Sequence, residues 1–250
     1  MEKQPVFELC AESLSACLAA REGGACRIEL CSALNDGGVT PSHALIKTAV
    51  AQSGLPVHVL LRPRAGNFVY SEEEFLLMLA DLQHAAALGA SGFVAGMLDT
   101  EGKIDQRRMR QLVQLAGGLE VTFHRAFDTL AGLEDALEQV IATGCRRVLT
   151  SGGAVDAETG ADRLRSLRER AGDRIVIAAG GGLRVSNAAY IAAMSGLNHF
   201  HGSVRRAGYG AGLSHLFGAE TQVHPTDIRA MIAELSHGIS TGAHRALPSR

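Results

Sequence analysis

Short apolar runs alternate with longer amphipathic runs along most of the chain. Each apolar run has four to seven residues, the usual length of a buried strand, and glycine, proline or polar residues follow most of them. The amphipathic runs carry apolar residues at helical spacing, and glycine marks several of their ends. This pattern predicts strands at 6–10, 27–31, 57–61, 92–98, 119–124, 147–150, 175–179 and 199–203, and helices at 12–22, 43–53, 72–88, 106–116, 130–143, 161–170, 186–194 and 226–236.

Eight strand–helix units in strict alternation predict an α/β protein with a parallel sheet covered by helices. Eight such units in 250 residues fit a closed (β/α)8 TIM barrel. The alternative is an open doubly wound sheet, but the glycine fingerprint of a dinucleotide fold is missing, because Ala11-Glu12-Ser13 follows the first strand. We expect a single barrel domain over 1–236 and a mobile tail over 237–250, where no periodicity is visible.

The first two strands share one pattern, Phe7-Glu8-Leu9-Cys10 and Ile28-Glu29-Leu30-Cys31. Strand side chains alternate between the two faces, and the outer face of a barrel strand packs on apolar helices. The polar members should therefore face the barrel axis. By the same alternation, the inward residues include Glu8, Cys10, Glu29, Cys31, His58, Arg62, Thr122, His124, His199 and His201.

Buried charges persist when they are paired, so we expect Glu8 and Glu29 to pair with Arg62 and Arg64. Such pairs can be internal salt bridges that only hold the barrel together. Polar residues at the carboxyl ends of the strands favour a functional site instead, since barrel sites form there.

The stretch 122–128 places a histidine, an arginine and an aspartate at the end of the fifth strand. His124 should point inward as a general acid or base, oriented by Asp128 or Glu29. Arg125 has the opposite parity and should form an ion pair at the rim. Asp128 is alternatively a cap of the next helix.

Glycine clusters follow the last three strands. Loops after the seventh and eighth strands often bind phosphate in barrels, through backbone N–H groups. Together with nearby arginines, they predict a site for an anion, although glycines also simply form tight turns. The candidate anion-binding residues are Arg62, Arg64, Arg125, Ser151, Gly181, Gly182, Gly202 and Ser203.

Two inward cysteines, Cys10 and Cys31, occupy matching places on adjacent strands. Two thiols at equal depth could bind a soft metal such as Cu(I). The alternative is two small residues that fill the barrel, since free cysteine is often buried. We assign no chemistry to Cys17, Cys26 and Cys145.

Composition limits the partners. Apolar residues make up 46% and charged residues 20%, as in ordinary globular proteins. The net charge of −2 and the lack of a basic patch argue against nucleic acid. No apolar run reaches the roughly 18 residues of a membrane span, and the first residues do not resemble a secretion signal. We therefore expect no membrane partner, a cytoplasmic location and reduced thiols.

Several stretches, in order over about residues 6–205, resemble the CutC family, which is associated with copper homeostasis. The resemblance implies a TIM barrel, a cytoplasmic homo-oligomer (dimer or tetramer) and Cu(I) bound by cysteine, with Cys10 and Cys31 at the family's typical positions. It is carried by Leu9-Cys10, Arg27-Ile28-Glu29-Leu30-Cys31, Gly37-Gly38-Val39-Thr40-Pro41-Ser42, Arg62-Pro63-Arg64-Ala65-Gly66-Asn67-Phe68-Val69-Tyr70, and the segments 99–105, 122–128, 147–152 and 180–182.

Two functions are therefore open. One is a copper-binding protein that uses Cys10 and Cys31. The other is a barrel enzyme, such as a lyase, isomerase or hydrolase, for a phosphorylated or carboxylated small molecule. A barrel that acts mainly through partner proteins is a third possibility.

Overall fold

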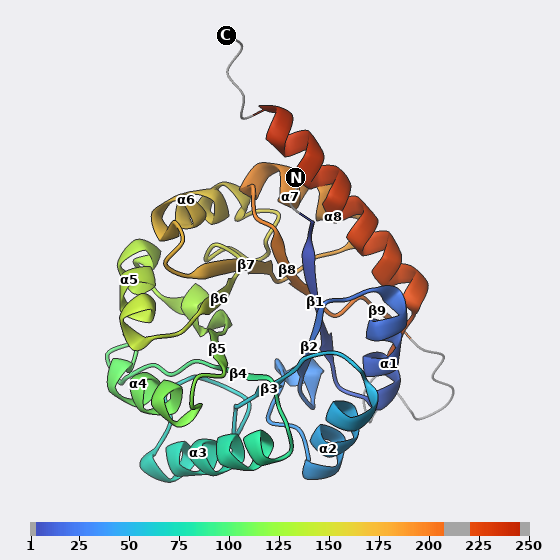
Figure 1. Ribbon diagram of the computed structural model, residues 1–250. Coiled ribbons are helices and arrows are strands. Elements are labelled where there is room, and N and C mark those ends of the chain that lie inside the picture. Colours follow the sequence, from blue (N-terminus) through green and yellow to red (C-terminus); the bar gives the residue numbers. More distant parts are fainter. Residues whose placement is uncertain (1–3, 208–220, 246–250) are drawn as a thin grey trace.

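Eight parallel strands close into a barrel in the computed structural model, which describes residues 4–207 and 221–245 (Figure 1). The first strand pairs with both the second and the eighth, so the predicted TIM barrel is confirmed and the open sheet is wrong. The strands are β1 (Val6–Ala11), β2 (Arg27–Leu30), β3 (Val57–Leu60), β4 (Gly92–Ala95), β5 (Glu120–Phe123), β6 (Arg147–Thr150), β7 (Val176–Gly180) and β8 (His199–Gly202).

Helices surround the barrel on its outside (Figure 1). Ser13, Ser42 and Ser71 cap the first three α-helices, because each hydroxyl accepts a backbone N–H of the first turn. None of the described helices has the length and apolar character that crossing a membrane requires. The α-helices are α1 (Leu14–Gly23), α2 (His43–Gln52), α3 (Glu72–Ala87), α4 (Gln106–Leu115), α5 (Leu133–Thr143), α6 (Ala161–Ala171), α7 (Val185–Ser195) and α8 (Pro225–Arg245), accompanied by the 3-10 helices η1 (Leu34–Asp36) and η2 (Arg125–Thr129) and the antiparallel pair β9 (Arg205–Ala207) and β10 (Thr221–Val223).

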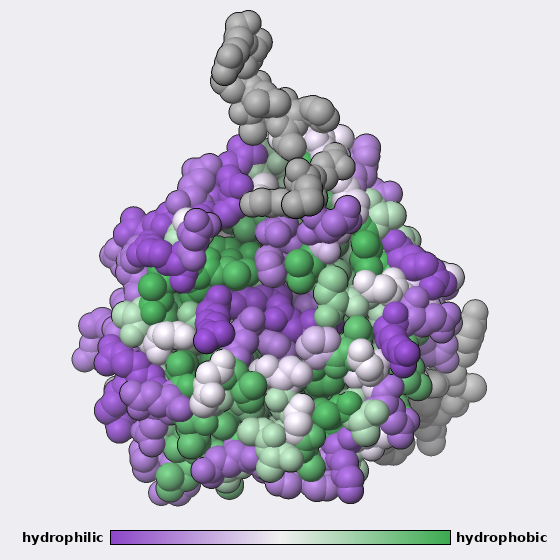
Figure 2. Space-filling view, in the orientation of Figure 1, coloured by the Kyte–Doolittle hydropathy of each residue, from purple (hydrophilic) through white to green (hydrophobic). Residues whose placement is uncertain are grey.

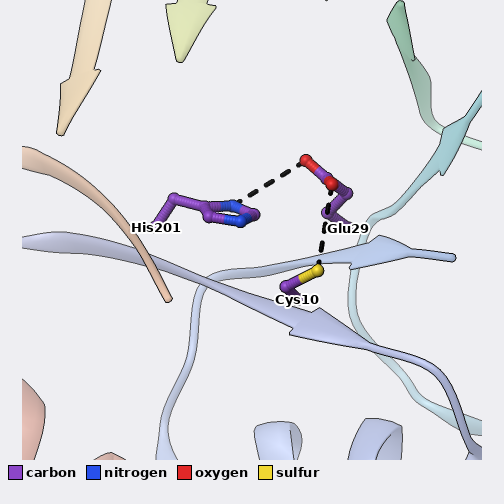
Figure 3. A group of neighbouring side chains, drawn as sticks. All are labelled: Cys10, Glu29 and His201. Carbon is purple, nitrogen blue, oxygen red and sulfur yellow. Dashed lines mark hydrogen bonds and ion pairs between the residues drawn. The ribbon is translucent and has the colours of Figure 1, made fainter. Parts of the chain in front are cut away.

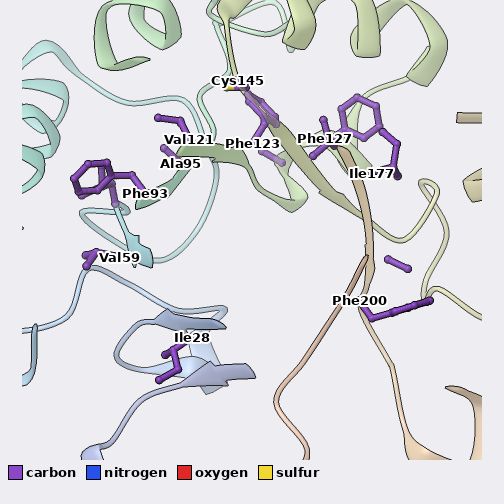
Figure 4. Close-up of a cluster of buried hydrophobic side chains, with 14 of the residues drawn as sticks. Ile28, Val59, Phe93, Ala95, Val121, Phe123, Phe127, Cys145, Ile177 and Phe200 are labelled. Carbon is purple, nitrogen blue, oxygen red and sulfur yellow. The ribbon is translucent and has the colours of Figure 1, made fainter. Parts of the chain in front are cut away.

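The apolar core lies mainly between the strands and the helices (Figure 4). Phe93, Phe123 and Phe200 point outward from their strands and are fully buried there. A second, much smaller cluster consists of Cys10, Cys31, Leu60 and Val94. Buried polar and charged side chains on the same strands include Glu8, Glu29, His58, Thr122 and Arg147. The barrel therefore holds charged groups as well as an apolar core.

The last helix is longer than the sequence pattern indicates. We expected a helix to Ser236 and a tail from residue 237, but α8 continues to Arg245. It packs closely on α7 through glycine: a Cβ on Gly238 would lie 2.2 Å from the carbonyl oxygen of Ala189. Small residues that pack this way leave no apolar period in the sequence, which explains the error. Residues 246–250 lie outside the described part of the chain.

Candidate functional site

A cavity of about 680 Å³ opens where the barrel strands end. Its walls come largely from strand ends and from the segments that follow β2, β3, β5, β7 and β8, which is where barrel enzymes place their sites. Figure 2 shows hydrophilic residues gathered over the centre of the barrel, with apolar residues around them. The predicted site residues in the cavity wall are Cys10, Glu29, Arg62, His124, Arg125, Gly181, Gly182, Gly202 and Ser203.

The other predicted site residues lie outside this wall. Cys31 is fully buried beside Cys10. Ser151 is buried and bonded to Asp128. Arg64 forms an ion pair with Glu74 on α3, so its expected pairing with Glu8 or Glu29 is wrong.

The two inward cysteines meet beside the cavity. The Sγ atoms of Cys10 and Cys31 lie 3.8 Å apart. Cys10 Sγ also lies 3.9 Å from Glu29 Oε1, a contact that Figure 3 shows. The contact with Cys31, burial and the nearby carboxylates of Glu29 and Glu8 raise the pKa of the Cys10 thiol well above its usual value. A metal must therefore displace a firmly held proton from this thiol.

The register of β1 against β2 differs from the one we expected. The shared strand pattern suggested that Cys10 lies opposite Cys31, but Cys10 pairs with Glu29 and Glu8 with Arg27. The offset is two residues, because closing a barrel requires neighbouring strands to be staggered. The thiols touch in spite of this offset.

Glu8 is the centre of a buried ion network. Its carboxylate lies 2.6 Å from Arg147 Nη1, 2.8 Å from Arg27 Nε and 2.8 Å from His201 Nδ1. Burial alone would raise the pKa of Glu8, but Arg147, His201 and Arg27 hold it well below its usual value. The expected pairing of Glu8 with Arg62 is therefore wrong, and Glu8 is a firmly ionised group.

Glu29 and His201 line the cavity together with Cys10. Figure 3 shows the three side chains next to one another. One possible ligand atom from each of the three residues lies within 4.8 Å of the others. Burial raises the pKa of Glu29. Burial would lower the pKa of His201, but the charge of Glu29 and the bond to Glu8 raise it overall. Sulfur, nitrogen and carboxylate oxygen thus converge at one point, as in a metal site.

His124 lies in a different part of the cavity wall. Its Nδ1 accepts the backbone N–H of Ala126 at 3.1 Å, and its Nε2 is buried without a partner among the described residues. Burial, reinforced by the charge of Arg62, lowers the pKa of His124 to about 3. The ring is therefore neutral, with its proton on Nε2. Neither Asp128 nor Glu29 forms a hydrogen bond to it in the described structure.

Asp128 instead fixes the loop after β6. Its carboxylate accepts the backbone N–H groups of Ser151 and Gly153, each at 3.1 Å, and a hydrogen bond from the Thr150 hydroxyl. It also forms the expected ion pair of Arg125, with an Nε–Oδ2 distance of 2.7 Å. It does not cap the next helix, which Gly132 precedes.

Arg62 is buried, and its guanidinium donates to three backbone carbonyl oxygens among the described residues. Its Nη1 donates to the carbonyls of Asp36 and Gly38, and its Nη2 donates to Gly66. Among the described residues, no carboxylate lies within 4.0 Å of its guanidinium nitrogens. Phe68 lies against it, with 5.3 Å from Cζ to the ring centroid.

Sequence reasoning missed two residues of the ion network, Arg27 and Arg147. Strand alternation places Arg27 on the same face as Glu29, and this signal was available. For Arg147, the partner Glu8 is 139 residues away in the chain, so no local pattern reveals the pair. His201 was expected to face inward but was not among the candidate site residues.

Comparison with known families gives a match over most of the chain. A family model described as "CutC family" matches residues 6–206. A "family protein CutC" from Chromobacterium violaceum is 48% identical over 200 residues, which is 80% of this chain and 81% of that protein. One from Bacteroides fragilis is 47% identical over 208 residues, 82% of each chain.

Solved structures agree on the fold. The structure titled putative copper homeostasis protein CutC, from Streptococcus agalactiae, has a TM-score of 0.76 and 33% identity, covering 80% of this chain and 99% of that one. A structure titled "QR15, an Aldolase" has a TM-score of 0.61, with 81% of this chain and 90% of that one covered. At 16% identity, this second likeness concerns the barrel fold alone.

Proposed function

This chain belongs to the CutC family, and from that premise we propose that it binds Cu(I) through Cys10 and Cys31 in a copper-homeostasis role. The observation that carries the proposal is the contact between the two thiols, 3.8 Å apart beside the cavity. Thiolates are soft ligands that favour Cu(I), and two of them suffice for a low-coordinate site. The relative from Streptococcus agalactiae, titled a putative copper homeostasis protein, supports the same role.

The surroundings of the thiols fit a metal ion. His201 and Glu29 offer a nitrogen and an oxygen near Cys10, so either could complete the ligand set. Glu8 bonds His201 Nδ1 at 2.8 Å, the arrangement by which a carboxylate orients a metal-binding histidine. The cavity gives an entry path to Cys10, and Cys31 lies directly behind it.

A competition titration tests the copper site. Cu(I) is titrated into the reduced full chain against a chromogenic Cu(I) chelator, and the double variant Cys10→Ser/Cys31→Ser is compared with wild type. Losing both sulfurs should weaken binding by at least ~100-fold, more than typical outer-shell changes do. Cys17→Ser, which replaces another buried thiol, should bind like wild type. Equally weak binding by all three proteins would refute the site.

The proposal includes a reducing compartment and self-association. We place the protein in the cytoplasm, since Cys10 and Cys31 must remain thiols to bind Cu(I). The family resemblance favours a homo-oligomer, a dimer or a tetramer. Light scattering of the purified chain would test this, and a single monomer mass would contradict it.

A second candidate is a barrel enzyme for an anionic small molecule. The observation in its favour is the cavity of about 680 Å³, which is lined by Arg62, a residue with no carboxylate partner in the part of the chain that the structure describes. Gly181, Gly182, Gly202 and Ser203 line the opposite wall and could supply backbone donors. Soaking crystals with inorganic phosphate tests it: density at these glycines or at Arg62 would support it, and an empty cavity would contradict it.

A further inference from the structure

Arg62 carries a buried positive charge that no acidic group among the described residues offsets. Only 5% of the residue is exposed, and its three hydrogen bonds end on backbone carbonyls. Carbonyl dipoles stabilise a guanidinium but leave its net charge in place. A buried charge of this kind is costly unless an opposite charge joins it, so the position favours an anionic ligand from the cavity.

The other arginines around the cavity are either paired with a carboxylate or exposed to solvent. Arg125 pairs with Asp128 at 2.7 Å, and Arg205 pairs with Glu12 at 3.2 Å. Arg206 pairs with Asp227. Arg184 is exposed at the start of α7, where solvent screens its charge. Arg62 is therefore the one buried arginine of the described cavity wall without a carboxylate, and a single negative charge matches it.

His124 presents a hydrogen-bond donor close to this charge. Because its Nδ1 accepts the Ala126 N–H, the neutral ring must carry its hydrogen on Nε2. That Nε2 is buried and has no partner among the described residues. Both groups also contact Phe68, whose ring centroid lies 4.9 Å from the His124 ring centroid and 5.3 Å from Arg62 Cζ. Both side chains line the same cavity.

We propose that Arg62 and His124 together recognise a small monocarboxylate that bears a second oxygen next to the carboxylate. Arg62 pairs with the carboxylate, and His124 Nε2–H donates to the neighbouring keto or hydroxyl oxygen. The proposal rests on the second candidate function above and narrows its substrate class. It also changes the role of His124, which acts as a neutral donor and not as an acid or base.

The free donors favour a carboxylate over phosphate. A guanidinium has five N–H donors, and the carbonyls take three of those of Arg62. The two that remain match a planar carboxylate, which carries one negative charge. A phosphate dianion would need a second buried cation, and the described wall offers none near Arg62 that lacks a carboxylate.

Calorimetry on the full chain tests this assignment with three probes at constant ionic strength: pyruvate, acetate and inorganic phosphate. Wild type should bind pyruvate in preference to acetate and phosphate. Arg62→Gln should weaken pyruvate binding by about 30-fold or more, the usual range for a lost charged hydrogen bond. Arg163→Gln is the control, because it also removes one arginine charge but lies on α6 outside the cavity wall, and it should bind like wild type.

Two variants of His124 test its role as a hydrogen-bond donor. His124→Phe should weaken pyruvate binding about tenfold and leave acetate unchanged, because acetate lacks the second oxygen. His124→Gln, which keeps an N–H donor, should restore part of the preference. These ratios, and the choice between pyruvate and phosphate by wild type, remain decisive if Arg62→Gln does not fold.

The outcomes separate this assignment from the proposed function. If phosphate binds best and the Arg62 and His124 variants bind it normally, the cavity is an anion site but our assignment is wrong. If none of the three probes binds, the assignment and the second candidate function both fail. Equal binding of pyruvate and acetate by wild type would show that His124 does not recognise a second oxygen.

Discussion

The buried His124 makes the stability of the folded chain depend on pH. The pKa of its folded-state imidazole is about 3, because burial and Arg62 disfavour the charged ring, whereas an unfolded histidine titrates near 6.5. Between these values the unfolded chain binds one more proton than the folded chain at this site. The stabilisation is therefore complete above pH 6.5 and is lost progressively as the pH falls toward 3.

This difference predicts a measurable slope. From pH 6.5 to 4, His124 should reduce the free energy of unfolding by up to ~1.4 kcal/mol per pH unit. His124→Gln should be correspondingly less sensitive to acid, which urea unfolding at several pH values would show. Parallel curves for the two proteins would mean that the pKa of His124 is the same in the folded and the unfolded chain.

Single residues also show what the sequence can and cannot specify. Strand alternation correctly predicted that Glu8, Cys10, Glu29 and His124 face the barrel interior, because parity depends only on local geometry. The partners of these residues were mostly wrong. Glu8 contacts Arg147 on a strand that is not its neighbour. Whether two such residues meet depends on the register between strands, which the sequence of one strand does not specify.

At the level of elements, the contact between α7 and α8 depends on a missing side chain. Gly238 is buried in α8, and a Cβ there would meet the backbone oxygen of Ala189 at 2.2 Å. A backbone atom cannot rotate away, so an added methyl group must push the helices apart.

We therefore expect Gly238→Ala to lower the free energy of unfolding by ~1–3 kcal/mol, although alanine favours a helix more than glycine does. His237→Ala, at an exposed neighbouring position, should change it by less than ~0.5 kcal/mol. Thermal or urea unfolding would measure both. A more stable Gly238→Ala protein would show that α8 does not pack on α7 in this way.

The same contact explains where element prediction failed. Helices with an apolar stripe, such as α5, were expected at nearly the observed residues. The second half of α8 packs through Gly238 and Gly242 instead. Glycine ordinarily signals the end of a helix, so the helix predicted from the sequence ended too early.

For the whole molecule, the buried ion network joins distant parts of the barrel. Glu8 on β1 contacts Arg27 on β2, Arg147 on β6 and His201 on β8. Removing the carboxylate charge leaves the buried Arg147 without a counter-ion among the described residues, which typically costs ~3–5 kcal/mol.

Glu8→Gln should therefore destabilise the barrel by about this amount, as measured by chemical unfolding at pH 7. Glu120→Gln serves as a control, since Glu120 also pairs with Arg27, at 2.7 Å, but is partly exposed. Its loss should cost less than ~1 kcal/mol. Similar effects of the two substitutions would argue that the Glu8 network contributes no more than a surface pair.

The overall topology was the easiest level to predict. Alternating strands and helices leave few architectures, and eight units of this length fit a closed barrel. The site was harder, because Cys10, Glu29 and His201 come from three strands and converge only when β1 pairs with both β2 and β8.

X-ray absorption at the copper edge, on reduced protein loaded with one equivalent of Cu(I), tests the copper site most directly. The thiol contact predicts two sulfur neighbours, with His201 or Glu29 as the source of any lighter third atom. Cys10→Ser/Cys31→Ser should lose the sulfur signal. A spectrum of wild-type protein with only nitrogen and oxygen neighbours would contradict the assignment of Cys10 and Cys31 as the copper ligands.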